Sequence, residues 1–273
     1  MPTQVVPTKA ADIAVWESDG VGPAVLLIHG NSSCKEIFRH QFDCTLGANF
    51  RLIALDLPGH GASSDARDPE RDYTMAGYAE TAVEVLKALG VARACVFGWS
   101  LGGHIAMDMI SRFDGVCGVM TCGSPPVPGG IEGLQMGFND SPHMSLSAGP
   151  NWSDADAETY SHATAGANAP YEPFMLASAK RTDGRARHFF FADVFAGRPQ
   201  SQREIAQTAK TPLAIVNGAE DPFLKHDYYD TVAFANLWGG KVHSLTGLGH
   251  APFWEAPDRF NPLLERFVIE TAG

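Results

Sequence analysis

Short runs of consecutive hydrophobic residues recur along the chain, separated by longer stretches of mixed character. An unbroken apolar run of four or five residues is typical of a strand that is buried on both faces. Such runs predict strands at residues 24–28, 51–55, 94–97, 118–122, 213–216 and 242–245. Apolar residues at helical spacing predict helices over residues 75–89, with Gly90 as C-terminal cap, and over residues 257–269. This alternation predicts an α/β fold with a mostly parallel, doubly wound sheet covered on both faces.

The alternation stops in the middle of the chain. Residues 124–130 carry three prolines and two glycines, which mark a loop, and no clear sheet strand follows for some seventy residues. Helical patterns occur there at 154–163 and 173–179. We therefore predict a helical cap at residues 124–203, inserted into an α/β core made of residues 1–123 and 204–273.

A serine stands at the point where one predicted strand meets a helix. Residues 98–102 read Gly-Trp-Ser-Leu-Gly, directly after the run 94–97 and before a helical pattern. This is the layout of a nucleophile elbow, a tight turn that holds the serine in a strained conformation above the sheet. Side chains two residues before or after the serine would clash across the turn, which is why glycines stand there. The pattern predicts Ser100 as a nucleophile.

A serine hydroxyl needs a base within hydrogen-bond reach, usually a histidine oriented by a carboxylate. In chains with this elbow the acid and then the histidine follow the serine in sequence. His250 lies in a loop after the last predicted strand, and Glu220 and Asp221 follow the strand at 213–216. The spacing from Gly218 favours Asp221 as the acid, with Glu220 as the alternative. We predict Ser100, Asp221 and His250 as a catalytic triad.

Two backbone N–H groups are expected to form the oxyanion hole. One belongs to Leu101, which starts the helix after the nucleophile, and the other to Asn31 in the loop after the first apolar run. The Asn31 side chain either assists or only shapes the turn. His104 is predicted to line a pocket or pack, and residues 56–63 to form a structural turn.

Composition narrows the possible partners. The net charge of −11 argues against nucleic acid or an anionic membrane as partner. The chain has neither clustered metal-ligand motifs nor a glycine-rich phosphate or dinucleotide loop, so we expect no metal and no cofactor. Five scattered cysteines suit a reducing compartment, and no signal peptide or membrane span is visible. These features predict a cytoplasmic protein acting on a small molecule.

The motifs together resemble the α/β-hydrolase superfamily over nearly the whole chain, and more narrowly its metal-independent N-acyl-homoserine lactone lactonases. The runs that carry the narrower resemblance are His29–Ser33, Phe97–Ile105, Arg181–Arg187, Asn236–Lys241 and Gly249–Phe253. The resemblance implies a triad at Ser100, Asp221 and His250, substrate contacts at Asn31 and Trp99, and a cap tyrosine at Tyr160. The chain departs from the family at Asp221, where those lactonases carry glutamate.

The resemblance implies a serine hydrolase that opens the lactone ring of quorum-sensing signals through an acyl-enzyme. A general carboxylesterase would use the same residues on acyclic esters. A variant would attack the amide of the same substrates. A non-catalytic ligand receptor on this fold is a further alternative.

Overall fold

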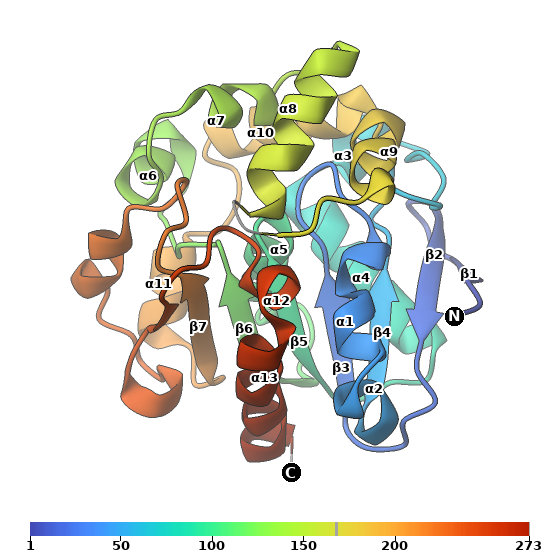
Figure 1. The fold of residues 1–273 in the computed structure, drawn as a ribbon, viewed down its shortest axis with the longest axis vertical. Coiled ribbons are helices and arrows are strands. Elements are labelled where there is room, and N and C mark those ends of the chain that lie inside the picture. The colour runs from blue at the N-terminus through green and yellow to red at the C-terminus, as the bar shows by residue number, and fades with distance from the viewer. Residues whose placement is uncertain (167–168, 273) are drawn as a thin grey trace.

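The sheet of the computed structural model is one layer of eight strands, and the structure describes residues 1–166 and 169–272 (Figure 1). The strands are β1 (Gln4–Pro7), β2 (Asp12–Glu17), β3 (Ala24–Ile28), β4 (Arg51–Leu55), β5 (Ala94–Trp99), β6 (Val116–Cys122), β7 (Leu213–Gly218) and β8 (His243–Leu245). Their order across the sheet is β1-β2-β4-β3-β5-β6-β7-β8. The six predicted strands are confirmed to within a few residues.

The sheet is parallel from β4 to β8 and antiparallel at its amino-terminal edge, where β1 pairs with β2 and β2 with β4. The predicted α/β class with a mostly parallel sheet is confirmed. The β1–β2 hairpin was not predicted, because its strands are short and β1 is largely exposed, so no unbroken apolar run marks them.

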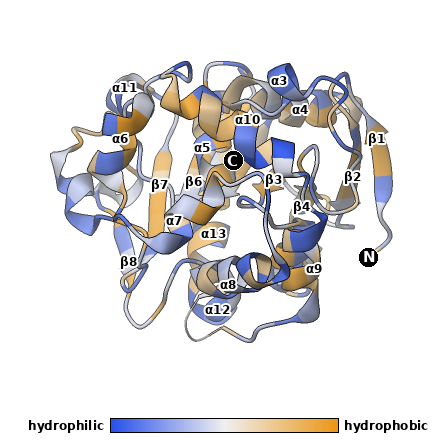
Figure 2. Ribbon diagram, turned by 90° about the horizontal axis from the view of Figure 1, so that it is seen from above, coloured by the Kyte–Doolittle hydropathy of each residue, from blue (hydrophilic) through white to orange (hydrophobic). Residues whose placement is uncertain are grey.

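Helices cover both faces of the sheet. One face carries η1 (Lys35–Phe38), α1 (Arg39–Phe42), α2 (Thr45–Asn49), α12 (Pro252–Glu255) and α13 (Pro257–Ala272). The other carries α3 (Pro69–Asp72), α4 (Met75–Ala88), α5 (Leu101–Met109) and α11 (Gln202–Thr208). Two short 3₁₀ helices, η2 (His226–Thr231) and η3 (Trp238–Gly240), lie between β7 and β8. Figure 2 shows the buried strand β7 in the hydrophobic colour and the largely exposed α3 in the hydrophilic one.

The segment between β6 and β7 contains helices and loops but no strand, within the part of the chain that is described. They are α6 (Gly130–Gly137), α7 (Pro142–Ser147), α8 (Asp154–Ala165), α9 (Pro173–Arg181), α10 (Gly184–Phe195) and α11. Helices α6 to α10 lie beyond the carboxyl end of the sheet (Figure 1), and we call them the roof. Helix α11 packs on α5 instead. The division into core and cap stays a prediction, and its residues 167, 168 and 273 lie outside the described residues.

Candidate active site

Ser100 stands in a strained backbone conformation between β5 and α5. Its φ of 54° and ψ of −120° lie in a region that side chains disfavour. The turn is tight enough that a Cβ on Gly98 would lie 2.1 Å from the Gly102 carbonyl oxygen, and one on Gly102 would lie 2.0 Å from that of Ile28. Both glycines are therefore required, and the geometry is that of a nucleophile elbow.

Hydrogen bonds from β6 hold the elbow in place. The Ser100 amide donates to the Cys122 carbonyl at 2.7 Å. The Ser124 hydroxyl donates to the Ser100 carbonyl, also at 2.7 Å. The end of β6 and the residue Ser124 after it thus fix the backbone of Ser100, which follows the neighbouring strand β5. The sequence alone did not point to Ser124 for this role.

Asp221 and His250 meet at the carboxyl end of β7. His250 Nδ1 lies 2.7 Å from Asp221 Oδ2, and both side chains are almost fully buried. Asp221 Oδ1 accepts a hydrogen bond from the Phe223 amide at 3.0 Å, which fixes the carboxylate. Because a carboxylate only accepts, Nδ1 of His250 carries the proton and Nε2 keeps a lone pair. His250 and Ser100 line the same pocket.

The structure distinguishes the two adjacent acids. Glu220 is exposed to solvent, whereas Asp221 is buried against His250. The backbone amide of Glu220 donates to the Leu248 carbonyl at 2.9 Å. Asp221, and not Glu220, is therefore the acid that contacts His250.

Trp99 supports His250 from behind. Its indole Nε1 donates to the His250 carbonyl at 2.8 Å, and the two rings lie 5.6 Å apart. The Phe223 ring lies 4.6 Å from the imidazole, and Gly123 approaches so closely that a Cβ there would lie 2.6 Å from His250 Cε1. The Trp99 side chain is buried and is not among the described residues that line the pocket. Its contact with substrate stays a prediction.

The loop after β3 presents its backbone, because its side chains are already engaged. Asn31 Nδ2 donates to the Ser147 carbonyl at 3.0 Å, and Asn31 Oδ1 accepts from the Ser32 hydroxyl at 3.1 Å. Ser32 has a φ of 56°, which is unfavourable for a residue with a side chain. The Asn31 side chain thus ties the loop to α7, and its N–H, with that of Leu101 at the start of α5, remains the predicted oxyanion donor.

Arg187 of α10 ends the motif Arg181–Arg187, but the sequence did not predict where its side chain lies. Its Nη1 lies 3.2 Å from the Ser32 hydroxyl, and its Nε donates to the Gly149 carbonyl at 2.7 Å. The guanidinium lies 3.9 Å from the centre of the Trp152 ring. Burial lowers the pKa of Arg187 to about 10. Arg187 therefore connects the roof to the loop that carries Asn31.

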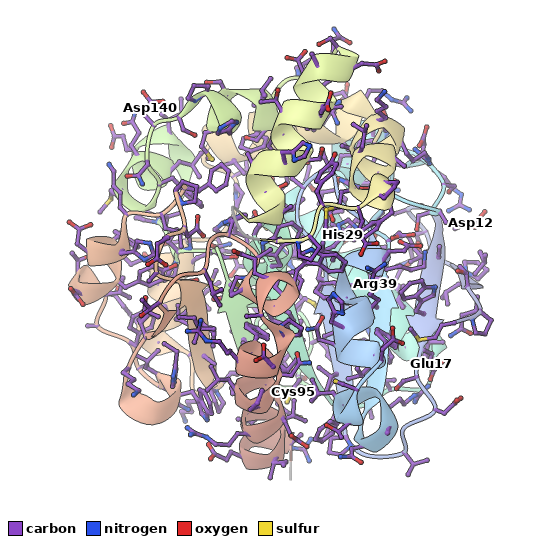
Figure 3. The ribbon with its side chains drawn as sticks, viewed as in Figure 1. Asp12, Glu17, His29, Arg39, Cys95 and Asp140 are labelled. Atoms are coloured by element: carbon purple, nitrogen blue, oxygen red, sulfur yellow. The ribbon has the colours of Figure 1, made fainter. Side chains whose placement is uncertain are left out.

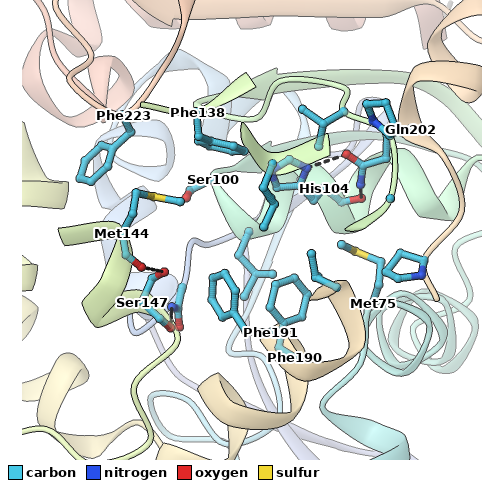
Figure 4. Close-up of a pocket in the computed structure, with 18 of the residues that line it drawn as sticks. Met75, Ser100, His104, Phe138, Met144, Ser147, Phe190, Phe191, Gln202 and Phe223 are labelled. Carbon is cyan, nitrogen blue, oxygen red and sulfur yellow. Dashed lines mark hydrogen bonds between the residues drawn. The ribbon is translucent and has the colours of Figure 1, made fainter. Parts of the chain in front are cut away.

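A pocket opens between Ser100 and the roof, and its empty space, part of which is open solvent, is about 820 Å³ (Figure 4). Tyr160 of α8 lines it, and its contact with substrate stays a prediction. Burial raises the pKa of the Tyr160 hydroxyl to about 12, while a hydrogen bond with Asn31 opposes the shift. The phenol is therefore neutral at pH 7.

The predicted structural turn at 56–63 is held by a buried ion pair. Asp56 accepts from Lys35 Nζ at 2.8 Å and from the Ala62 amide at 2.8 Å, and both charged side chains are almost fully buried. Burial alone would lower the pKa of Lys35, but the Asp56 carboxylate outweighs it and raises that pKa. His29, labelled in Figure 3, accepts from the Leu57 amide at its Nε2 and is structural.

No group of three or more His, Cys, Asp or Glu side chains gathers to hold a metal ion within residues 1–166 and 169–272. Across the same described ranges, no helix combines the length and apolar character needed to cross a membrane.

An alpha/beta hydrolase family model matches residues 25–263. The crystal structure of the N-acyl homoserine lactonase AidH complexed with N-butanoyl homoserine is 45% identical, with a TM-score of 0.95 over 98% of this chain and 96% of that one. A 2-hydroxy-6-oxononadienedioate/2-hydroxy-6-oxononatrienedioate hydrolase from Pseudomonas sp is 26% identical over 262 residues, or 89% of this chain and 87% of the relative. The esterase RhEst1 from Rhodococcus sp. is 22% identical, with a TM-score of 0.79 over 99% of this chain and 100% of that one, and shares the fold.

Proposed function

Since this chain belongs to the alpha/beta hydrolase family and is a hydrolase enzyme, we propose that it opens the lactone ring of N-acyl-homoserine lactones. In this proposal Ser100 is the nucleophile, His250 the base and Asp221 the acid that orients it. The observation that carries the proposal is the pairing of His250 Nδ1 with Asp221 Oδ2 at 2.7 Å beside the strained Ser100, in a chain 45% identical to a lactonase of this kind.

The first step is attack on the ring carbonyl. His250 Nε2 takes the proton of the Ser100 hydroxyl as the oxygen bonds to the lactone carbon. Asp221 stabilises the imidazolium that forms and keeps the ring oriented, because its other oxygen is held by the Phe223 amide. The developing oxyanion lies against the N–H groups of Asn31 and Leu101, each worth ~3 kcal/mol of barrier.

Collapse of the tetrahedral intermediate breaks the ring C–O bond. His250 gives its proton to the leaving alkoxide, which stays attached to the same molecule as a homoserine hydroxyl. Water, deprotonated by His250, then attacks the Ser100 ester and releases N-acyl-homoserine. The pocket is lined by both apolar and polar side chains, which suits this substrate class. Its apolar side chains accommodate an acyl chain, and Tyr160 offers a hydroxyl to the polar lactone and amide end of the substrate.

Mass spectrometry of N-acyl-homoserine lactones after incubation with the enzyme tests the proposal. We expect the lactone to gain one water. The rate of this reaction should be insensitive to a chelator and should fall roughly 10⁴- to 10⁶-fold in Ser100→Ala. An enzyme-free sample corrects for uncatalysed ring opening. Release of homoserine lactone and a fatty acid would instead show amide cleavage. Turnover of acyclic p-nitrophenyl esters with unchanged lactones would make the protein a general carboxylesterase.

A further inference from the structure

A hydrogen-bonded polar pair lies among apolar side chains in the wall of the pocket (Figure 4). His104 of α5 and Gln202 of α11 lie side by side there. The neighbouring wall residues are apolar: Val127, Leu134, Phe138, Phe190, Phe191 and Val194. The proposed mechanism uses neither member of the pair.

The hydrogen bonds of the pair determine where the His104 proton lies. Gln202 Nε2 donates to the His104 backbone carbonyl at 3.1 Å, and Gln202 Oε1 lies 2.6 Å from His104 Nδ1. The carbonyl can only accept, so the amide cannot be turned the other way round. Because Gln202 Oε1 is itself an acceptor, Nδ1 must carry the proton. His104 Nε2 therefore carries a lone pair.

The imidazole keeps this form at neutral pH. Burial lowers the pKa of His104 to about 4, although the bond with Gln202 opposes the shift. Nε2 has no hydrogen-bond partner among the described residues, and it is accessible to solvent. His104 Nε2 thus presents an unpaired acceptor to whatever fills the pocket.

We propose that His104 Nε2 selects acyl-homoserine lactones whose chain carries a hydroxyl on its third carbon over those with a keto group there. This inference rests on the proposed lactonase function. A hydroxyl donates to Nε2, whereas a keto oxygen places a second acceptor against it and an unsubstituted chain displaces water without replacing its hydrogen bond.

The spacing along α5 supports the third carbon as the position read. His104 follows Ser100 by four residues, a rise of about 6 Å along a helix. In an extended substrate the third acyl carbon is five bonds from the lactone carbonyl carbon, which also spans about 6 Å. A substituent on that carbon therefore comes level with His104 in a substrate whose carbonyl lies at Ser100 and whose acyl chain runs along α5.

The test compares kcat/KM for N-butanoyl-homoserine lactone with its 3-oxo form and with each enantiomer of its 3-hydroxy form. We expect one 3-hydroxy enantiomer to exceed the 3-oxo form by roughly tenfold. In His104→Phe, which keeps a ring of similar size without the acceptor, this ratio should fall toward one. Leu134→Ala enlarges the same wall without touching the acceptor, and it should preserve the ratio.

Binding of the same lactones to Ser100→Ala, measured by calorimetry, gives a second readout that does not depend on turnover or on folding of His104→Phe. The 3-hydroxy form should bind more tightly by a similar factor. Equal kcat/KM and equal affinity for all four lactones, or an unchanged ratio in His104→Phe, would overturn this inference alone. Absence of turnover with every lactone would overturn the proposed function and this inference with it.

Discussion

The pocket lies between two regions that are held together in different ways. We call the carboxyl ends of β3 to β7 and the loops that follow them the floor. The proposed catalytic groups of the floor are held by bonds from the strand ends: the Phe223 amide binds Asp221, and the Ser100 amide binds the end of β6. The roof is attached through loops, both by side chains, as Asn31 binds the Ser147 carbonyl, and by backbone, as the Lys225 amide binds the Gly137 carbonyl. The floor is thus preorganised by the sheet, whereas single bonds from loops attach the roof.

Each region also contains one buried cation, and the two are stabilised in different ways. Lys35, in the floor, is neutralised by the equally buried Asp56. Arg187, in the roof, has no carboxylate within ion-pair distance among the described residues and is held by carbonyl groups, the Ser32 hydroxyl and the Trp152 ring. A guanidinium tolerates this environment because its charge is delocalised and weakly hydrated.

The largest expected effect comes from breaking the floor at its acid. Asp221→Asn should lower kcat about 10⁴-fold, because an amide that donates to His250 favours the wrong tautomer. Glu220→Gln alters the neighbouring acid and should change kcat less than twofold, since that side chain is exposed. Steady-state kinetics of both variants, with circular dichroism as folding control, measure this. Equal losses in the two variants would contradict the assignment.

Removing the carboxylate from the buried ion pair should strongly destabilise the floor. Asp56→Ala leaves the buried, charged Lys35 with only the partly exposed Glu36 as an ion-pair partner, which we expect to lower the free energy of unfolding by about 3–5 kcal/mol. Asp65→Ala removes an exposed carboxylate paired with Arg181 and should cost less than about 1 kcal/mol. Urea denaturation compares them, and a similar loss for both would show that the buried pair has no special weight.

The connection between roof and floor is tested at Arg187. Arg187→Met removes the bonds to Ser32 and Gly149 and should lower the free energy of unfolding by about 1–3 kcal/mol. It should also lower kcat/KM, since the loop with Asn31 loses its anchor. Arg185→Met changes an exposed arginine two residues away on α10 and serves as the matched control. A stability loss in Arg187→Met with unchanged kinetics would limit its role to the roof.

The smallest expected effect is a pH dependence that arises where floor and roof meet. Burial holds the pKa of His60 well below its usual value. The unfolded chain therefore binds a proton near pH 6.5 that the folded one does not, so stability falls as pH drops below that value. The contribution is at most about 1.4 kcal/mol per pH unit.

Urea denaturation at pH 7 and pH 5 measures this dependence. His60→Gln should reduce the loss of stability between the two values, whereas His188→Gln, at an exposed histidine of α10, should not. An identical pH dependence in the wild-type protein and His60→Gln would rule out His60 as its source.

Much of the floor was predictable because it follows local rules. Strands buried on both faces must be mostly apolar, so the runs of β3 to β7 were visible in the sequence, whereas the sixth predicted strand, β8, lies at the edge of the sheet. The elbow was equally visible, since only glycine fits at Gly98 and Gly102. The edge hairpin β1–β2 escaped prediction because an exposed strand needs no such run.

The roles of Arg187, Ser124 and the Asn31 side chain were not predictable. Each depends on a partner far away in sequence, such as Ser32 for Arg187, and no spacing rule relates such pairs. The choice between Glu220 and Asp221 was favoured by spacing, but their relative burial decides which one reaches His250.

The sequence by itself determined the α/β class, the elbow at Ser100 and the order of serine, acid and histidine. These features depend on backbone sterics and on burial within single elements, which neighbouring residues report. Only the tertiary structure decided how α10 anchors the loop of Asn31 and which His104 tautomer faces the pocket. Hydrogen bonds between distant side chains are directional over about 3 Å, so they exist only once the chain has brought both partners together.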